Sequence, residues 1–373
     1  MARRFGVSLL TVQRWLERAG DRDLDDVAWS DRPSAPHRQS RRIAPELEDR
    51  ILDARRRLRE ESPLGEHGAA AVLRDLAEHP DAGRPLPSVR TIGRVFERRG
   101  VLDARRRIRR PAPPPGWYLP TVVARSVELD SFDTIEGLFL KGGGEMEVLT
   151  GISLHGGLPV AWPAEPYTAS RVATALLGHW RLHGSPGYAQ FDNAAIFHGT
   201  HGYPDRIGRV SRLCLGLGIV PVFAPPRETG FQAAVESFNG RWQARLWGRS
   251  YNETREILVA RSATYIAAFR ARSAARIEAA PPRPAVPAAW DFDLNAPLAG
   301  RVVYIRRTDE RGGASLLGQR FAVDPRWPHR LVRAELDLDE GAIRFHALRR
   351  REPEDQPLLR EIAHRIPEHR LRS

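Results

Sequence analysis

Apolar residues near the N-terminus recur at the spacing of amphipathic helices. The pattern covers segments 9–20, 45–59, 68–78 and 88–100. Residues three and four apart share one face of a helix, and that face can be buried against a neighbour. We predict a short helical hairpin within residues 1–40 and a three-helix unit within residues 41–116.

Two of these segments are copies of each other. Segments 8–20 and 88–100 match at the serine, the threonine, two arginines, the glutamate and the glycine, and each serine is placed to cap its helix. Paired helices of this kind on a basic chain favour helix-turn-helix units, whose second helix enters the major groove of DNA. We expect Gln13, Arg14, Arg90 and Arg94 to contact DNA. Two ordinary hairpins with a basic solvent face are the alternative.

The first copy begins abruptly at Met1, with most of its leading helix missing. Either this module is degenerate, or the true start of the protein lies upstream.

From residue 120 onward, strand and helix patterns alternate. The predicted order is three strands (122–129, 147–154 and 158–162), a helix (168–182), a strand (188–191), a helix (203–217), a strand (219–223) and a helix from about residue 230. Proline-rich stretches at 111–116 and 281–287 look like linkers, because proline cannot continue a helix or an inner strand. We therefore predict an α/β core with a mixed sheet over residues 117–280.

Three carboxylates stand at distinctive places in this order. Asp130 ends the first predicted strand, Asp192 follows the fourth, and Glu236 lies on the late helix. If the first and fourth strands are neighbours, the two aspartates lie side by side and the helix brings Glu236 to them. Asp133 and Glu136 are nearby alternatives, and we favour Asp130 because it ends the apolar strand.

Converging carboxylates repel one another unless a cation lies between them. Hard oxygen ligands suit Mg²⁺ or Mn²⁺. Two such ions can activate an attacking hydroxyl and stabilise the leaving oxygen of a phosphoryl transfer. The pattern predicts Asp130, Asp192 and Glu236 as catalytic metal ligands.

The core resembles the retroviral-integrase superfamily, in particular bacterial insertion-sequence transposases. The likeness rests on Val127 to Asp130, Phe191 to Phe197 and Ala234 to Asn239. It implies an RNase H-like fold with an Asp-Asp-Glu metal site, and an oligomer that joins two DNA ends. The interval between Asp192 and Glu236 is longer than usual in the family, and alanine follows Asn193 where glycine is common.

Further residues attract attention around the core. Arg241 and Arg245, beyond Glu236, are candidate phosphate contacts. His198 could also approach phosphate, although no histidine spacing supports a zinc site. Cys214, the only cysteine, is expected to be a small buried apolar residue.

The C-terminal part alternates short apolar stretches with turns. Residues 290–350 are predicted to form a small antiparallel β-barrel, like the one that follows the core in Mu-type transposases, and residues 351–373 a basic tail. Non-specific DNA contact is its expected task, with a purely structural barrel as the alternative.

The amino-acid composition predicts a polyanionic binding partner. The net charge is +12 and Lys141 is the only lysine, so arginine supplies nearly all the positive charge. Arginine suits phosphate contacts, although GC-rich coding also raises its frequency. No apolar run is long enough to cross a bilayer, and no signal core follows Met1. We expect a cytoplasmic, nucleoid-associated bacterial protein that binds double-stranded DNA.

Together these features predict a transposase that cleaves a DNA phosphodiester at element ends and joins the freed 3′-hydroxyl to target DNA. Two alternatives remain open. One is a DNA-binding regulator or domesticated relative with an inactive core. The other is a structure-selective nuclease with the same fold, which would cut DNA without joining the cut end.

Overall fold

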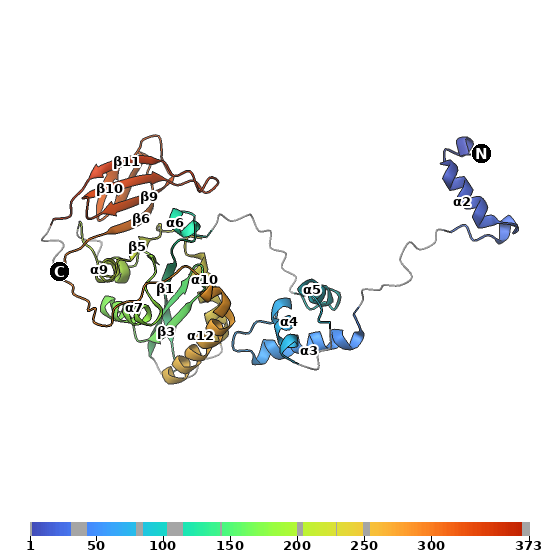
Figure 1. Cartoon of the computed structure of the whole chain (residues 1–373), viewed down its shortest axis with the longest axis horizontal. Coiled ribbons are helices and arrows are strands. Elements are labelled where there is room, and N and C mark those ends of the chain that lie inside the picture. The colour runs from blue at the N-terminus through green and yellow to red at the C-terminus, as the bar shows by residue number, and fades with distance from the viewer. Residues whose placement is uncertain are drawn as a thin grey trace.

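A computed structural model gives the architecture of the chain (Figure 1). It describes residues 2–30, 43–79, 85–102, 115–141, 144–199, 204–228, 230–248 and 254–367. Most of the first proline-rich stretch, 111–116, lies outside these ranges.

The two matching N-terminal segments form helices with the same cap. Residues 2–30 contain α1 (Ala2–Phe5), α2 (Leu9–Ala19) and the short η1 (Leu24–Asp26). The hydroxyl of Ser8 accepts the amide of Thr11 at 3.1 Å, and that of Ser88 accepts the amide of Thr91 at 3.2 Å. Each hydroxyl satisfies an amide that the first turn leaves unpaired, which confirms the predicted caps.

Three helices pack as one unit: α3 (Pro45–Glu61), α4 (Ala69–Glu78) and α5 (Val89–Arg98). Their shared core contains Ile51, Val72 and Ile92, all fully buried. The predicted three-helix unit is therefore present. Packing alone does not establish a DNA-binding helix-turn-helix.

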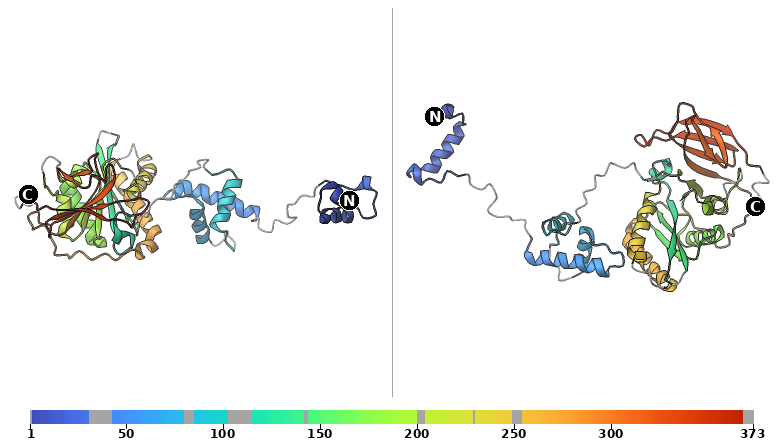
Figure 2. Two further views of the ribbon diagram at one scale, coloured as in Figure 1. Left: turned by 90° about the horizontal axis from the view of Figure 1, so that it is seen from above. Right: turned by 180° about the vertical axis from the view of Figure 1, so that it is seen from behind.

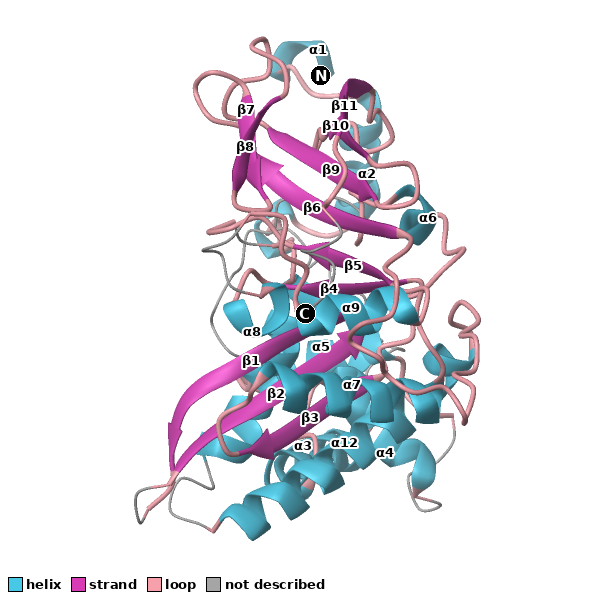
Figure 3. Cartoon of the chain, turned by 90° about the vertical axis from the view of Figure 1, so that its left-hand side faces the viewer, coloured by secondary structure: helices cyan, strands magenta, loops and turns pink. Residues whose placement is uncertain are grey.

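The central sheet is mixed, as predicted. Its strands are β1 (Leu129–Phe139), β2 (Glu145–Ser153), β3 (Pro159–Ala164), β4 (Tyr188–Phe191) and β5 (Val220–Phe223), in the order β3-β2-β1-β4-β5. β2 is antiparallel to its neighbours, whereas β1, β4 and β5 run parallel. This arrangement is consistent with an RNase H-like core, and it makes β1 and β4 neighbours (Figure 3).

Helices cover both faces of the sheet. One face carries α7 (Ala169–His183), α8 (Ala195–His198) and α9 (Arg209–Gly216), and its core contains Trp180 and Cys214 together with Phe132 of β1. The other carries α10 (Ala233–Trp242), the π-helical η3 (Gln243–Trp247) and α12 (Arg255–Glu278). Figure 2 shows α12 as a column along that side. None of the described helices, α12 included, combines the length and apolar character of a membrane-spanning segment.

The first predicted strand was wrong in position. Residues 120–123 form a short helix, α6 (Pro120–Val123), and β1 begins only at Leu129. Pro120 stands at the first turn of α6, where its missing amide costs nothing. Asp130 is therefore the second residue of β1 and not its end.

The C-terminal strands extend the core sheet. β6 (Arg301–Arg307) pairs in parallel with β5, and β9 (Leu331–Asp337), β10 (Ala342–Ala347) and β11 (Leu358–Ala363) follow in antiparallel order. β7 (Gly313–Leu316) and β8 (Gln319–Ala322) form a separate hairpin. The predicted closed barrel is not confirmed, because the described strands form an open sheet joined to the core. β11 lies where we predicted only a basic tail.

The three-helix unit touches the core through Arg245 of η3. Its guanidinium donates to the carbonyl oxygens of Pro63 and Glu60, at 3.1 and 3.4 Å, and to that of Ser62. These carbonyls lie at the end of α3, where helical carbonyls have no partner within the helix. Arg272 of α12 adds an ion pair with Glu66 at 2.8 Å.

Candidate active site

The register of β1 and β4 brings two aspartates together. Asp130 pairs with Ala189 and Ser131 with Gln190. Continuing this register by two residues along each strand reaches Asp133 on β1 and Asp192 just after β4. The carboxylate beside Asp192 is therefore that of Asp133.

Asp133 faces the side of the sheet that α10 covers. The amide of Asn239, on α10, donates to the Asp133 carboxylate at 2.8 Å. Gln232, at the start of the same helix, donates to the carbonyl of Phe132 at 3.1 Å. These two bonds fix α10 against β1 at the position of the carboxylate.

Glu236 enters from the exposed first turn of α10. Burial first, and then the charges of Asp192, Glu236 and Glu136, raise the pKa of Asp133 to about 6, against an opposing bond from the Thr134 amide. Burial and the charge of Glu136 also raise the pKa of Asp192, although the Ala194 amide donates to it at 3.0 Å. The carboxylates therefore repel one another.

No basic side chain in the described part of the chain neutralises this group. Asp133, Asp192 and Glu236 form no ion pair within 4.0 Å with any described Lys, Arg or His side chain. Within the same residues, no set of three or more His, Cys, Asp or Glu side chains already stands as a closed metal cluster. The carboxylates thus form an open acidic group that would have to draw together around a cation.

Asp130 has a different environment. It is three residues from Asp133, and because successive side chains of a strand alternate between faces, it points to the α7 side. Arg283 holds it with two bonds, 2.8 Å to Oδ1 and 2.6 Å to Oδ2, and the indole of Trp180 donates to Oδ2 at 3.2 Å. Its side chain is only 2% exposed.

Arg283 ties the second proline-rich stretch to the core. It also donates to the carbonyls of His183 and Gly184, both at 3.1 Å, and the amide of Ser185 donates to the carbonyl of Pro284 at 2.8 Å. Burial by itself lowers the pKa of Arg283, but the charge of Asp130 and the bonds to it raise it. These bonds hold the stretch 281–287 against β1 and against the end of α7.

The structure therefore brings Asp133, and not Asp130, to the part of β1 that lies beside Asp192. Asp130 lies on the face opposite Asn239 and is neutralised by Arg283, so a cation would compete with a buried guanidinium. The sequence did carry a signal for Asp133: Phe132, Thr134 and Ile135 all favour strands, which allows the strand to continue past Asp130.

The other candidate residues are dispersed. Gln13 and Arg14 are exposed on α2, and Arg90 and Arg94 are exposed on α5. Arg241 lies over the ring of Phe269 at 5.0 Å and donates to the carbonyl of Ser237. Arg245 binds the end of α3, as described above.

His198 is buried among aromatic side chains. It is 6% exposed, and its ring packs edge-on against Phe223 and Tyr304 at 4.8 and 5.8 Å. These contacts make it part of the core.

Comparison with known proteins gives fold likenesses. No protein-family model matches the sequence, and no curated protein matches it. The chain is similar to the catalytic core domain of BIV integrase, at 20% identity over 37% of this chain and 80% of that chain, with a TM-score of 0.29. It is also similar to the HTLV-2 integrase catalytic core domain solved in complex with magnesium, at 14% identity over 36% and 81%, with a TM-score of 0.28.

A third solved structure aligns over more of the chain. It is the simian T-cell lymphotropic virus intasome in complex with the PP2A regulatory subunit B56 gamma, at 13% identity over 73% of this chain and 92% of that chain, with a TM-score of 0.34. Likenesses at these scores say nothing about the reaction, so the function is inferred from the geometry of the site.

Proposed function

We propose that this protein is a metal-dependent polynucleotidyl transferase that acts on DNA, a transposase or integrase, with Asp133, Asp192 and Glu236 as its metal ligands. The observation that carries the proposal is the acidic group at β1, β4 and α10, which no basic side chain of the described residues neutralises. Holding two half-buried carboxylates near an exposed third one costs free energy, which a bound cation recovers.

The donor set fits Mg²⁺ or Mn²⁺. All three ligands are carboxylates, and these ions prefer hard oxygen donors and keep waters of their own. Such an ion, or a pair of them, would supply Lewis-acid stabilisation of charge on phosphate oxygens. Asn239 orients the Asp133 carboxylate from the helix side, and the Ala194 amide fixes that of Asp192.

The reaction proposed has two steps. Water attacks a phosphodiester at the element end and gives a 5′-phosphate and a free 3′-hydroxyl. That hydroxyl then attacks a phosphodiester of target DNA, forming a new P–O bond while the target strand's own 3′-oxygen leaves as a hydroxyl. Gln13, Arg14, Arg90 and Arg94, on the two serine-capped helices, are the proposed DNA contacts. Joining two DNA ends implies a homo-oligomer. The same proposal includes a bacterial insertion-sequence origin for the protein.

Arg245 takes a different part in this proposal from the one expected. It holds the three-helix unit against the core, so that DNA bound by α5 would be presented to α10. Arg241 stays a candidate phosphate contact, because it is exposed beyond Glu236 on the same helix.

A DNA-binding protein with an inactive core is the second candidate. It is favoured by one observation: the described residues contain no closed metal cluster. Such a protein would bind the element ends without cutting them.

Glu236→Gln separates these candidates. A strand-transfer assay with Mg²⁺ and DNA carrying the element's flanking repeats should show cleaved and joined products for the unchanged chain. The variant should lose both by at least about 100-fold, because one charge-stabilising group is worth several kcal/mol in such a site. Glu278→Gln, an exposed substitution on α12, is the matched control and should react normally. A native chain that binds the ends but yields neither product would support the inactive core, and cutting without joining would indicate a nuclease.

The raised pKa of Asp133 predicts pH-dependent metal binding. Proton and cation compete for the same carboxylate, so Mn²⁺ affinity should fall as the pH drops through about 6. Between pH 7.5 and pH 5 the loss should be about tenfold if one proton is displaced. Calorimetric titration across this range measures it, and a flat profile down to pH 4.5 would show that Asp133 is not a ligand.

A further inference from the structure

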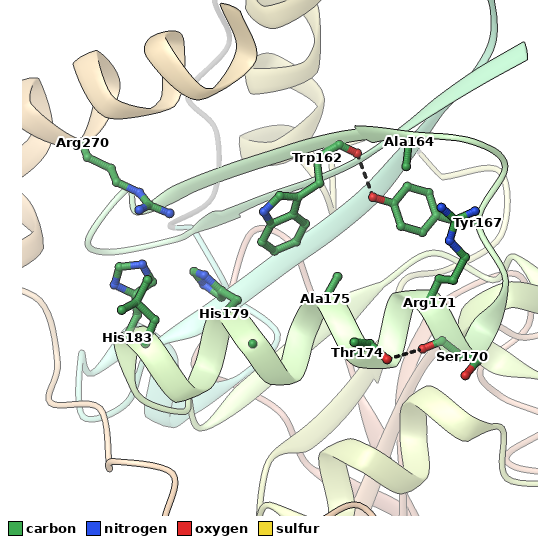
Figure 4. Close-up of a pocket in the computed structure, with 12 residues that line it drawn as sticks. Trp162, Ala164, Tyr167, Ser170, Arg171, Thr174, Ala175, His179, His183 and Arg270 are labelled. Carbon is green, nitrogen blue, oxygen red and sulfur yellow. Dashed lines mark hydrogen bonds between the residues drawn. The ribbon is translucent and has the colours of Figure 1, made fainter. Parts of the chain in front are cut away.

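A cavity on the α7 side of the molecule has no part in the proposed reaction. It occupies about 660 Å³ between α7, β3 and α12, within the usual range for small-molecule sites. Figure 4 shows Arg270 reaching from α12 toward His179 and His183 of α7, with Trp162 beside them and Tyr167 farther along. Cationic and neutral donors thus lie at one end of the cavity, next to aromatic rings.

Arg270 is a cation at this end with no carboxylate partner among the described residues. It is half-buried, and burial is the only cause that lowers its pKa. Its recorded bonds are two long ones, both 3.4 Å, to the carbonyl of Pro159, and no carboxylate of the described chain lies within 4.0 Å of it. Arg171, at the other end of the cavity, instead has Glu165 at 3.8 Å. The Arg270 end therefore suits an anion.

Two imidazoles complete that end. His179 and His183 are one turn apart on α7, with ring centroids 5.0 Å from each other. Burial first, and then the charges of Arg270 and Arg283, lower both pKa values against the opposing charge of Asp130, and that of His179 falls to about 3. Nε2 of His183 is buried with no hydrogen-bond partner among the described atoms. A neutral imidazole with an unpaired nitrogen can donate to an oxyanion.

The aromatic side of the cavity indicates what the anion is attached to. Trp162 lies edge-on to His179 at 5.9 Å and Tyr167 donates to the Trp162 carbonyl at 2.8 Å, so both rings are fixed. Fixed aromatic rings next to cationic donors are the elements of single-stranded nucleic acid sites, where bases stack and phosphates pair. A bare anion would use only one end of the cavity.

We propose that this cavity binds a nucleotide unit, with its phosphate at Arg270 and His183 and its base against Trp162 and Tyr167. The unit comes either from an unpaired DNA strand or from a free nucleotide, and the phosphate chemistry is the same. This site is separate from the carboxylates, so Asp133→Asn should leave it intact.

Fluorescence anisotropy of the full chain tests the proposal. The probe is a 5′-phosphorylated thymidine trinucleotide with a 3′ fluorophore, in low salt without divalent cations. Arg270→Gln should weaken binding about tenfold or more, as expected for loss of a charged hydrogen bond. His183→Gln should weaken it less, and thermal melting checks that both variants fold. Arg261→Gln removes the same charge from α12 outside the cavity and should change binding less than twofold.

Competitors identify the source of the phosphate. Displacement by an unlabelled trinucleotide at concentrations where thymidine monophosphate fails would assign an unpaired strand, and the reverse order would assign a free nucleotide. Equal loss in the Arg270 and Arg261 variants would overturn the proposal, because net charge would then explain binding. Competition by a carboxylate-terminated peptide as strong as that by either nucleotide would also overturn it.

Discussion

Asp133→Asn should abolish metal-dependent DNA cleavage, lowering the rate by at least about 1000-fold. The reason is that Asp133 lies opposite Asp192 in the β1–β4 register and carries the raised pKa of a carboxylate among like charges. Removing a ligand from such a site forfeits several kcal/mol of charge stabilisation, and about 1.4 kcal/mol is a factor of ten in rate. Single-turnover cleavage with Mg²⁺ or Mn²⁺ measures the loss.

The same variant should make the metal-free fold more stable. A carboxyl whose pKa is raised by folding contributes stability below its unfolded pKa near 4, and that contribution is lost as the pH rises through about 6. The neutral amide should therefore raise the melting temperature at pH 7.5 by about 2–4 °C, for roughly 1 kcal/mol of relief. Saturating Mn²⁺ should stabilise the native chain and not the variant. A destabilised variant that still responds to Mn²⁺ would count against the assignment.

Asp130→Asn should lower the stability of the fold and keep the response to Mn²⁺, which is the opposite of what we expect for Asp133→Asn. It leaves Arg283 as a buried cation without its partner, and breaking a buried pair from one side costs about 3–5 kcal/mol. The melting temperature should fall by about 6–20 °C. The stabilisation by Mn²⁺ should persist, because Asp130 and Asp133 face opposite sides of β1.

A double variant controls for burial. Asp130→Leu with Arg283→Met removes both charges and should recover much of the stability that Asp130→Asn loses, since an apolar replacement of a buried pair is often neutral. If Asp130→Asn melted normally and lost the Mn²⁺ response, Asp130 would be the ligand that the sequence first suggested.

The mixed sheet and its helices could be predicted from local patterns. The predicted strand 188–191 is β4 itself, and the helix predicted at 168–182 differs from α7 by one residue at each end. The helix α7 has a buried face and a cap at Thr168, and β4 is a short buried run that ends at polar residues, so local patterns locate both. The sequence set neighbouring first and fourth strands only as a condition of the site, and the structure shows β1 paired with β4.

The choice between Asp130 and Asp133 could not be made in the same way. It depends on where β1 begins, and strand ends are weakly encoded when a proline-led turn such as α6 precedes them. It also depends on Arg283, which lies in a proline-rich stretch that local composition marks only as a linker. Contacts across 153 residues leave no periodic trace in the sequence.

The tail shows a second limit of local patterns. Alternation identified most of its strands, but the pairing of β6 with β5 joins them to the core sheet. Barrel closure and sheet extension use the same alternating strands, so only the partner of the edge strand distinguishes them.

Anomalous scattering from crystals soaked in Mn²⁺ tests the central claim most directly. We predict a peak between the carboxylates of Asp133 and Asp192, with Glu236 turned toward it. A peak at Asp130, with Arg283 displaced, would contradict the account. So would a well-ordered acidic group that stays empty at saturating Mn²⁺.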